Sequence, residues 1–527
     1  MASIRSIPRQ HGWFSLDRAR ALLPRRRWRV ALSLAVLVFL TLGLSAGAAA
    51  AELRAGAAKV EITRPDTQPA NDPLYVKALV VSDGITTAAV VTVDAVAIAE
   101  IGSIPNEYLD EVRSRLQKEM DIDPQHVLIN ASHCHGAVCS DIGDRTVRAV
   151  REAYRNMVPV AAGAGAGHED RIMENRRLRL RDGREADVRH AYSLPPDEQV
   201  AAVGPVDPEI GVLRLDRKNG TTLAVVYNFA CHPIQGVPSG RNTADLSGFA
   251  SRVIEDCLGE GAVALFLQGC GGDVNPVLYK DVAHPRDAEP LGNMLGLSTM
   301  RAVRAVRTRE DVSLKVIREI LALPRADLGK RIEALEAEQA RLVRSLKGTT
   351  LNLKTFLPLI VKYQLSQEFP SYDSHRYLHD RALGREGLDR LDAENRRHMD
   401  QYVKNIYVME ELTRLQVNLE LLRKHQARNA ASGSKTIEAE VLGLRIGEFV
   451  LIAFPGELSV QIGLNIKQRS PHALTFVSGC SNGYLYYAPT AEQLRNPGAA
   501  QEDCECLLAP QWQALFEKKA WEILHRL

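Results

Sequence analysis

Residues 75–93 run YVKALVVSDGITTAAVVTV, two apolar stretches joined by Asp83-Gly84. An Asp-Gly pair supplies the positive φ values that a tight hairpin turn requires. We therefore predict two antiparallel strands, Tyr75–Ser82 and Ile85–Val93. Strands this apolar need other layers of structure to cover them, which favours a layered domain.

Further strands and helices alternate along the rest of the chain. Apolar residues at three-and-four spacing predict a helix, and a short apolar run predicts a buried strand. The mixture predicts an α/β fold of mixed α+β layers, with a strand-rich core flanked by helices. The predicted helices are Asn106–Met120, Leu246–Leu258, Leu291–Val306 and Trp512–Leu527, and the further strands are His126–Asn130, Glu209–Asp216, Thr221–Phe229, Ala262–Leu267, Thr436–Leu444 and Glu448–Ala453.

Two segments in the middle of the chain predict a long α-helical insertion. Asp327–Leu346 and Gly387–Gln426 are rich in Ala, Glu, Leu and Arg with helical spacing, and we expect an antiparallel pair. Arg428–Lys435 would be a flexible return to the main domain. Between the helices, the apolar segment Leu351–Leu365 fits a buried helix, the lining of an acyl-chain entrance, or a surface that lies on a membrane. The expected organisation is a signal or anchor over residues 1–51, a main domain over 52–325 and 433–527, and the insertion over 326–432.

Charge is divided unevenly along the 527 residues, which hold 66 Lys and Arg against 64 Asp and Glu. Residues 1–51 contain eight Arg and a single acid, Asp17, so the remainder has 58 basic and 63 acidic residues. A weakly acidic domain lacks the net positive charge that attracts the phosphate backbone of nucleic acids, so we expect no nucleic acid partner.

The first 51 residues have the pattern of an export signal. Arginines precede Ala31–Ala51, which contains no charge and ends with Ala49 and Ala51 in an Ala-x-Ala cleavage pattern. About 20 apolar residues also fit an uncleaved membrane anchor. We therefore expect a periplasmic or secreted protein, or one anchored by residues 31–51. In an oxidising compartment the eight cysteines can form disulfides.

Clusters of reactive side chains follow four apolar strands, at the strand ends where open sheets present their sites. In the first, His133 and His135 can converge on a metal or only cap the strand. In the second, His232 fits a metal ligand or a buried histidine bonded to the backbone. In the third, Gly271 and Gly272 would offer N–H groups to an oxyanion or form only a tight turn.

The third cluster also holds Cys270, which is a candidate nucleophile or a buried thiol. In the fourth, Glu457 follows an apolar run, and a buried carboxylate there needs a metal or an arginine as partner. The tyrosines nearby, Tyr484, Tyr486 and Tyr487, alone predict a packed aromatic loop.

Together these clusters offer two histidines, one glutamate and an open position, a common ligand set for catalytic Zn²⁺. No HExxH motif is present, so the ligands would have to come from distant strand ends. A structural zinc site built from His133, Cys134, His135 and Cys139 is the rival arrangement.

Taken in order, these segments resemble the neutral ceramidase family (neutral/alkaline non-lysosomal ceramidases) over much of residues 53–527. The resemblance implies a zinc-dependent hydrolase of amide bonds, with His135 bonded to substrate or to the attacking water. It implies zinc ligands at His133, His232, Glu457 and Tyr487, the last chosen by aligning Tyr-Ala-Pro-Thr with the family's Tyr-x-Thr-Thr. The segments that carry it are Ala55–Thr63, Ala131–Gly136, Phe229–Pro233, Gln268–Pro276, Pro455–Glu457 and Asn482–Thr490.

Two departures from the family pattern concern specificity. Asn275 stands where the family has a serine that takes part in amide cleavage. An amide side chain cannot act as a nucleophile, although it can orient water or donate to an oxyanion. Larger members of the family also carry a C-terminal β-sandwich domain, which we do not expect here.

The leading hypothesis is an exported zinc hydrolase that cleaves an N-acyl bond, such as that of ceramide. Gly271, Gly272 and Asn275 would steady the oxyanion, and His135 would relay a proton. One alternative, prompted by Asn275, is a metallohydrolase of the same scaffold acting on a smaller amide or an ester. The other is a non-catalytic envelope protein that binds zinc or lipid. The expected partner is a lipid or small amide substrate, with peripheral membrane contact through apolar surface; the oligomeric state stays open.

Overall fold

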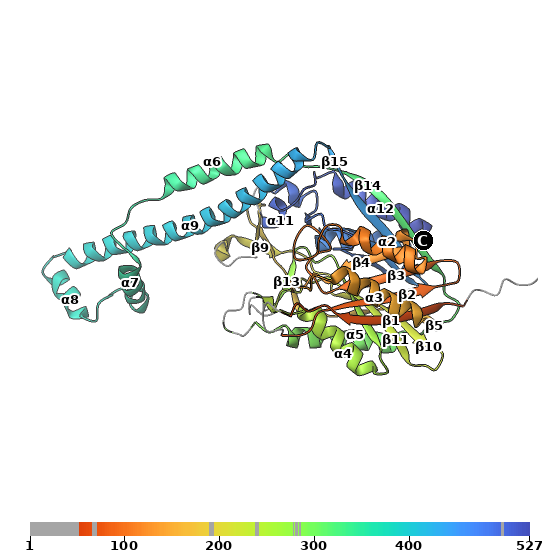
Figure 1. Ribbon diagram of the computed structural model, residues 1–527. Coiled ribbons are helices and arrows are strands. Elements are labelled where there is room, and N and C mark those ends of the chain that lie inside the picture. Colours follow the sequence, from red (N-terminus) through yellow and green to blue (C-terminus); the bar gives the residue numbers. More distant parts are fainter. Residues whose placement is uncertain are drawn as a thin grey trace, which may run out of the picture. The chain divides into compact units, whose positions relative to one another are not determined.

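A computed structural model describes residues 52–65, 71–188, 194–237, 242–277, 279, 283, 286–496 and 500–527. The predicted signal or anchor, residues 1–51, lies outside the described residues. Residues 52–527 form one compact unit of mixed strands and helices, so the predicted α/β class is confirmed (Figure 1). In the described part of the chain, no helix combines the length and apolarity needed to cross a bilayer.

The larger sheet has eight strands in the order β12-β11-β10-β5-β1-β2-β3-β4. The predicted hairpin is confirmed, because β2 and β3 pair antiparallel. Its second strand begins at Thr87 because the Asp83 carboxylate accepts the N–H groups of Ile85 and Thr86 within the turn. The strands are β1 (Arg54–Glu61), β2 (Tyr75–Ser82), β3 (Thr87–Val93), β4 (Val127–Ala131), β5 (Val158–His168), β10 (Glu209–Arg217), β11 (Thr222–Phe229) and β12 (Val263–Gln268).

The two edges of this sheet approach each other. Thr92 on β3 donates its hydroxyl to the Phe266 carbonyl on β12 at 2.7 Å. The N–H of Gln268, at the end of β12, donates to the Asn130 side chain on β4 at 3.0 Å. The sheet therefore curls until the ends of β4, β11 and β12, far apart in the strand order, lie together.

A second sheet packs on the first with the order β14-β15-β16-β18, and an apolar core fills the space between the sheets. Leu213 and Leu265 of the first sheet meet Leu444, Phe449 and Phe476 of the second in that core. A two-stranded parallel pair, β17 and β19, lies beyond it. The strands are β14 (Leu314–Pro324), β15 (Thr436–Ile446), β16 (Phe449–Ala453), β17 (Glu457–Leu458), β18 (Thr475–Ser478) and β19 (Tyr487–Ala488).

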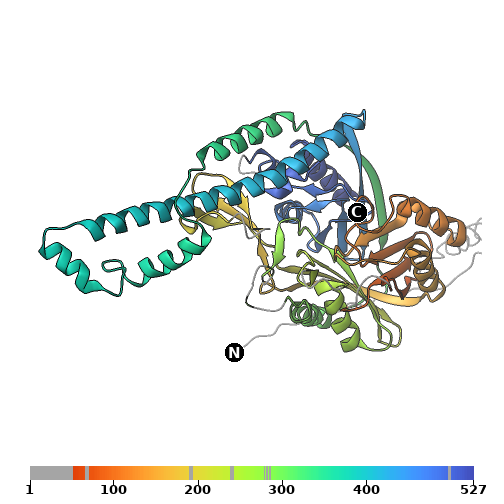
Figure 2. The same ribbon diagram turned by 60° about the vertical axis from the view of Figure 1, so that its left-hand side comes forward.

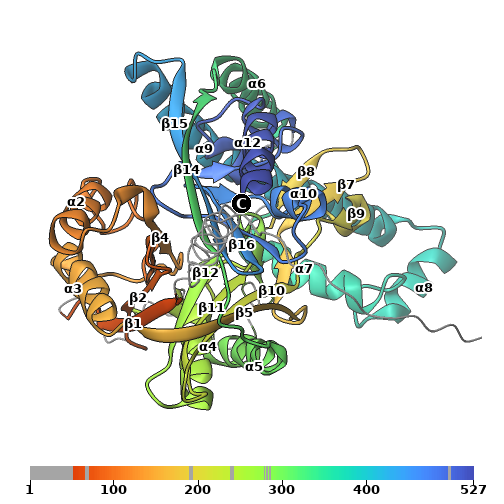
Figure 3. The ribbon, with the colours of Figure 1, turned by 90° about the vertical axis from the view of Figure 1, so that its right-hand side faces the viewer.

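Helices cover the outer faces of both sheets (Figure 3). The pair α2 and α3 packs on the β1–β4 side, α4 and α5 on the β10–β12 side, and α10 and α12 on the second sheet. These helices are α2 (Tyr108–Met120), α3 (Ile142–Arg155), α4 (Asp245–Leu258), α5 (Glu289–Ala305), α10 (Val460–Arg469) and α12 (Trp512–Arg526). The short elements are β6 (Met173–Asn175), β7 (Arg177–Leu180), β8 (Glu185–Asp187), β9 (Val200–Val203), β13 (Val274–Pro276), α11 (Gln501–Cys504) and single 3-10 turns at Pro124–His126, Asp197–Gln199 and Gln493–Arg495.

The helical insertion leaves the second sheet after β14 and returns to it at β15 (Figure 2). The predicted antiparallel pair is confirmed, since Leu328 bonds to Gln426 at one end of α6 and Lys347 bonds to Asn405 beyond the other. The predicted flexible return is wrong at its start, because α9 continues to Ala431. Asn429 is held there by the carbonyls of Ala326 and Leu507. The helices are α6 (Gly329–Ser345), α7 (Leu353–Leu365), α8 (Ser374–Ala382) and α9 (Gly387–Ala431).

All eight cysteines are free, so the expected disulfides are absent from the structure. Seven of the eight are buried, and only Cys257 is exposed. Burial raises the pKa of the Cys270 thiol far above its usual value, which removes the thiolate that a nucleophile needs. Cys270 is therefore a core residue, packed near Gly463.

Candidate metal centre

Three predicted metal ligands converge in the structure. His232 Nε2 lies 3.0 Å from Glu457 Oε2, and His133 Nε2 lies 3.2 Å from the same oxygen. One possible ligand atom from each of the three residues lies within 4.8 Å of the other two. All three side chains are buried.

Backbone carbonyls fix the direction of both imidazole rings. His133 Nδ1 bonds to the Val96 carbonyl at 2.6 Å, and His232 Nδ1 bonds to the Gly271 carbonyl at 2.5 Å. With each Nδ1 engaged by a backbone carbonyl, each Nε2 faces the other predicted ligands and is the atom that could bind a metal. Apart from its 3.2 Å approach to Glu457 Oε2, the buried His133 Nε2 has no hydrogen-bond partner among the described residues, which a bound metal would explain.

Strained backbone places the first histidine. His133 has φ = 67°, in the left-handed region that non-glycine residues avoid, two residues after β4 ends. Its N–H donates to the Ala95 carbonyl at 2.9 Å, which holds the turn. Strain of this kind is often concentrated at functional sites, because the surrounding structure must offset its cost.

Burial and neighbouring charges shift the pKa values of the three converging side chains. Burial disfavours charge on Glu457, but attraction to His133 outweighs it and lowers the pKa of the carboxyl well below its usual value. Burial likewise opposes a charge on His133, but Glu457 raises the pKa of that imidazole well above its usual value. Burial and the charge of Arg176 lower the pKa of His232 to about 4. A metal bound here would therefore meet a neutral His232, whereas His133 would first have to release a proton.

Two tyrosine hydroxyls reach the centre. Tyr487, the predicted fourth ligand, has its hydroxyl 3.4 Å from His232 Nε2. Tyr484 donates its hydroxyl to Glu457 Oε1, and burial together with Glu457 raises the pKa of Tyr484 well above its usual value. Tyr486 turns away, because its hydroxyl accepts a bond from Arg428 of α9. The donors present, two imidazole nitrogens, one carboxylate and a phenol, fit Zn²⁺.

Arg176 belongs to the same site, although no sequence pattern predicted it. Its guanidinium donates to Tyr487 Oη at 3.3 Å, to Asn275 Oδ1 at 3.0 Å and to the Gly272 carbonyl at 2.5 Å. Its Nε forms an ion pair with Glu502 at 2.6 Å, and both side chains are buried. No sequence signal marks Arg176, because it is one of five arginines between residues 171 and 181.

The Arg176 guanidinium bridges Asn275 and Tyr487, because it donates a hydrogen bond to each of them. The side-chain carbonyl oxygen of Asn275 is occupied by the Arg176 guanidinium, in a fully buried setting. Asn275 is therefore near the predicted ligands, and the bond to Arg176 fixes the orientation of its amide.

The predicted role of the glycine loop is wrong. Gly271 N–H donates to the Gly269 carbonyl and Gly272 N–H donates to the Leu458 carbonyl, both at 2.9 Å. These N–H groups are therefore occupied within the protein and do not face an oxyanion. Gly271 instead orients His232 through its carbonyl. At Gly272 a Cβ would lie 2.7 Å from the Glu457 carbonyl oxygen, so this glycine allows β17 to approach.

A cavity of about 270 Å³ opens onto the centre. His135 is exposed on its wall, with its ring centroid 5.5 Å from that of His133. The wall has an apolar part, formed by Val96, Ile101, Ile234 and Val237, and a polar part that includes Arg176, Tyr484, Tyr487, Gln501 and Glu505.

The rival structural zinc site is wrong. His133 faces Glu457 rather than Cys134, His135 and Cys139. Among the described residues, His133, His232 and Glu457 are the only group whose ligand atoms lie close enough together to share a metal ion. Burial raises the pKa of Cys134 well above its usual value, which disfavours a thiolate ligand.

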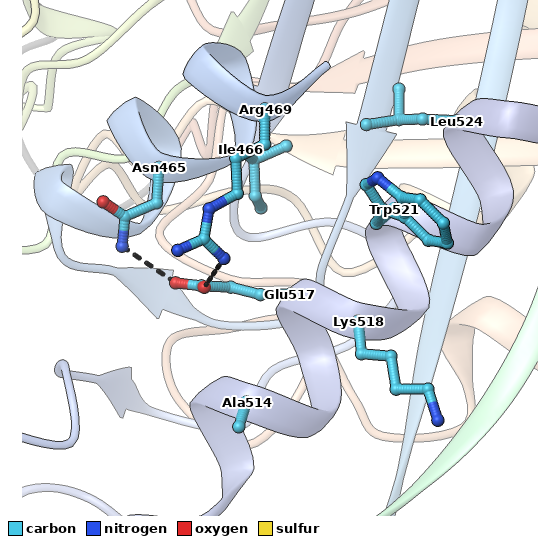
Figure 4. A pocket seen from close by; sticks show the side chains of 8 residues that line it. All are labelled: Asn465, Ile466, Arg469, Ala514, Glu517, Lys518, Trp521 and Leu524. Atoms are coloured by element: carbon cyan, nitrogen blue, oxygen red, sulfur yellow. Dashed lines mark hydrogen bonds and ion pairs between the residues drawn. The ribbon is translucent and has the colours of Figure 1, made fainter. Parts of the chain in front are cut away.

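A separate hollow of about 380 Å³ lies between α10 and α12 (Figure 4). Glu517 in its lining is already bonded by Asn465 and Arg469. The remaining lining is Ile466, Ala514, Lys518, Trp521 and Leu524, none of which belongs to the metal centre.

The fold is similar to that of solved ceramidases. A neutral ceramidase from Pseudomonas aeruginosa matches with a TM-score of 0.56 at 16% identity, over 90% of this chain and 75% of that one. A structure described as ceramidase complexed with C2 matches with the same TM-score and identity, over 90% of this chain and 76% of the other. No family model and no curated protein matches the sequence. The comparison establishes a ceramidase-like fold.

Proposed function

We propose that this protein is a zinc-dependent amidohydrolase of the neutral ceramidase type, acting on the N-acyl bond of ceramide or a related lipid. The observation that carries the proposal is the convergence of His133, His232 and Glu457 on the wall of a cavity in a ceramidase-like fold. The order of the sequence segments that resemble the family supports the same assignment.

His133, His232, Glu457 and Tyr487 would hold the metal. Zn²⁺ bound there would supply a Lewis acid and a water of lowered pKa. In the hydrolysis, the water oxygen bonds to the acyl carbon, the C–N bond breaks, and a carboxylic acid and an amine leave. His135 is exposed in the cavity, and an imidazole there can accept a proton from water and return it to the leaving nitrogen.

Arg176 and Asn275 would act on the negative charge that develops during the reaction. Arg176 touches Tyr487 and is a fixed positive charge beside the ligands, so it can stabilise negative charge developing near Tyr487. Asn275 holds the Arg176 guanidinium in place by accepting a hydrogen bond from it. The Val96, Ile101, Ile234 and Val237 wall gives an apolar surface for the chain next to the scissile amide.

A smaller amide or an ester is the second candidate substrate. The observation that favours it is Asn275, whose amide is held by Arg176 where the family places a serine. An enzyme without that hydroxyl must depend on metal-activated water alone for the nucleophile.

Metal content and turnover test the proposal together. The purified protein should hold one equivalent of zinc, lose it to a chelator, and hydrolyse at least one member of a panel of ceramides, N-acyl amino acids and short esters. His133→Ala combined with His232→Ala should abolish both zinc and turnover. Stoichiometric zinc in that double variant would refute the assigned ligands, and zinc without turnover on the whole panel would favour a binding protein.

Export is part of the proposal and depends on the N-terminal sequence. Arginines before Ala31–Ala51 and the Ala49-x-Ala51 pattern support cleavage before Glu52. N-terminal sequencing of the mature protein should therefore begin at Glu52. A mature chain that retains residues 31–51 in the membrane fraction would indicate the anchor instead.

A further inference from the structure

Helix α7 is fixed on α9 by two aromatic side chains. Phe356 is buried and stacks on Tyr402 with ring centroids 4.6 Å apart. The buried Tyr363 donates its hydroxyl to the Asp392 carboxylate at 2.6 Å. A capping box between Asn352 and Thr355 closes the start of the helix. These contacts decide which face of α7 turns outward.

The outward face of α7 is aliphatic. Leu353, Leu357, Val361 and Leu365 are 59%, 52%, 57% and 83% exposed. Their spacing of four residues places them in one strip along the helix. Helix α7 lies in the part of the insertion that is distant from both sheets (Figures 1 and 2). A contiguous exposed strip of this kind usually marks an interaction surface.

The charge beside the strip is positive. Residues 346–367 contain Lys347, Lys354 and Lys362 and no Asp or Glu, although residues 52–527 as a whole are weakly acidic. All three lysines are exposed. No ion pair found among the described residues includes Lys354 or Lys362. Lysines beside an aliphatic face are typical of helices that lie in the plane of a membrane interface.

We propose that α7 binds the surface of an anionic lipid bilayer. Its four aliphatic side chains would enter the acyl region, and Lys354 and Lys362 would remain among the headgroups. A second copy of the chain fits this face less well, because a symmetric contact would bring the lysines of both copies together. The proposal involves no residue of the metal centre and does not rest on the proposed function.

Vesicle binding tests the proposal. Residues 52–527 form one compact unit, and the apolar cores found among the described residues all lie in it, so the chain from Glu52 is the protein to use. It should co-float with phosphatidylcholine vesicles that contain phosphatidylglycerol, bind pure phosphatidylcholine more weakly, and dissociate as salt is added. Leu357→Glu combined with Val361→Glu should lower partitioning at least about tenfold.

The matched control is Ile85→Glu combined with Leu297→Glu. These side chains are 92% and 52% exposed and lie on the β2–β3 turn and on α5, so this variant should bind vesicles like the original protein. As a second measurement, Leu357→Trp should show a blue-shifted fluorescence maximum when anionic vesicles are added.

Three results would overturn the proposal. These are no binding of the original protein to anionic vesicles, equal losses in both double variants, or an unshifted fluorescence maximum for the Leu357→Trp variant when it is bound. Loss of a dimer in the α7 double variant without vesicle binding would assign the face to a second copy. A protein that binds vesicles but hydrolyses no amide would refute the proposed function and leave this proposal standing.

Discussion

Glu457 and Tyr487 lie opposite each other in the parallel pairing of β17 with β19. The pairing is short, two residues on each strand, and the Glu457 N–H donates to the Tyr486 carbonyl at 2.9 Å. Backbone hydrogen bonds thus place a carboxylate and a phenol, thirty residues apart in sequence, on one side of two histidines. The geometry of the centre depends on this pairing.

Glu457→Gln should remove the metal and leave the fold intact. The amide keeps the size of the side chain but loses the charge that binds both imidazoles, so zinc affinity should fall at least about 100-fold. Metal analysis after dialysis and circular dichroism are the two measurements. Glu448→Gln, which changes an exposed carboxylate in the turn between β15 and β16, is the control. Full zinc occupancy in the Glu457 variant would show that the carboxylate is not a ligand.

Gly272→Ala should weaken zinc binding without touching a ligand. The added Cβ would lie 2.7 Å from the Glu457 carbonyl oxygen and 2.9 Å from that of Leu458, so β17 must move. We expect zinc affinity about 10- to 100-fold lower, as for other changes that misplace a ligand. Gly348→Ala, where a Cβ meets nothing within 4 Å, should leave zinc affinity unchanged. Equal affinities in both variants would contradict this account of Gly272.

Arg176→Met should destabilise the protein, because it leaves the Glu502 carboxylate buried without its closest partner. Breaking a buried ion pair in this way costs about 3–5 kcal/mol of unfolding free energy. Adding Glu502→Gln should restore much of that stability, as measured by urea denaturation. Turnover should stay low in the double variant, because the guanidinium beside Tyr487 is still missing. Recovery of turnover together with stability would reduce Arg176 to a structural role.

Asp72→Asn should change how stability depends on pH. Burial raises the pKa of Asp72 to about 7 from 3.8, so the folded protein holds this proton more tightly than the unfolded chain. The raised pKa therefore has no effect on the unfolding free energy below about pH 4. As the pH rises toward 7, it lowers the unfolding free energy progressively, by up to about 4 kcal/mol.

The unfolding free energies of the Asp72→Asn variant and of the original protein are measured at pH 4.5 and at pH 7.5, and their difference is compared between the two pH values. The unfolding free energy of Asp72→Asn relative to the original should increase between these two values. Asp110→Asn on the exposed face of α2 should show no such increase. A flat difference for Asp72→Asn would mean that the carboxyl stays charged in the folded protein.

Several features could be predicted from local sequence because their physical cause is local. Asp83-Gly84 requires a turn, and the strands on either side are apolar, so the β2–β3 hairpin followed directly. The long helices of the insertion followed from their spacing, although the end of α9 did not. Its last turn is held by bonds from Asn429 to residues 103 and 78 positions away. Arg176 was missed for the same reason, since its partners Tyr487 and Glu502 are more than 300 residues distant.

The Tyr75–Val93 hairpin, the long insertion helices and the candidate ligands His133, His232 and Glu457 could be predicted from the sequence, because periodicity and residue chemistry are properties of short segments. That these side chains meet, and that the N–H groups of Gly271 and Gly272 face backbone carbonyls, depends on contacts between distant segments. The sheet must curl until β12 reaches β3 and β4, and β17 must pair with β19, before the ligands share one centre. The contacts that curl the sheet join residues more than a hundred positions apart, and their free energy comes from burying the core between the layers rather than from any local pattern.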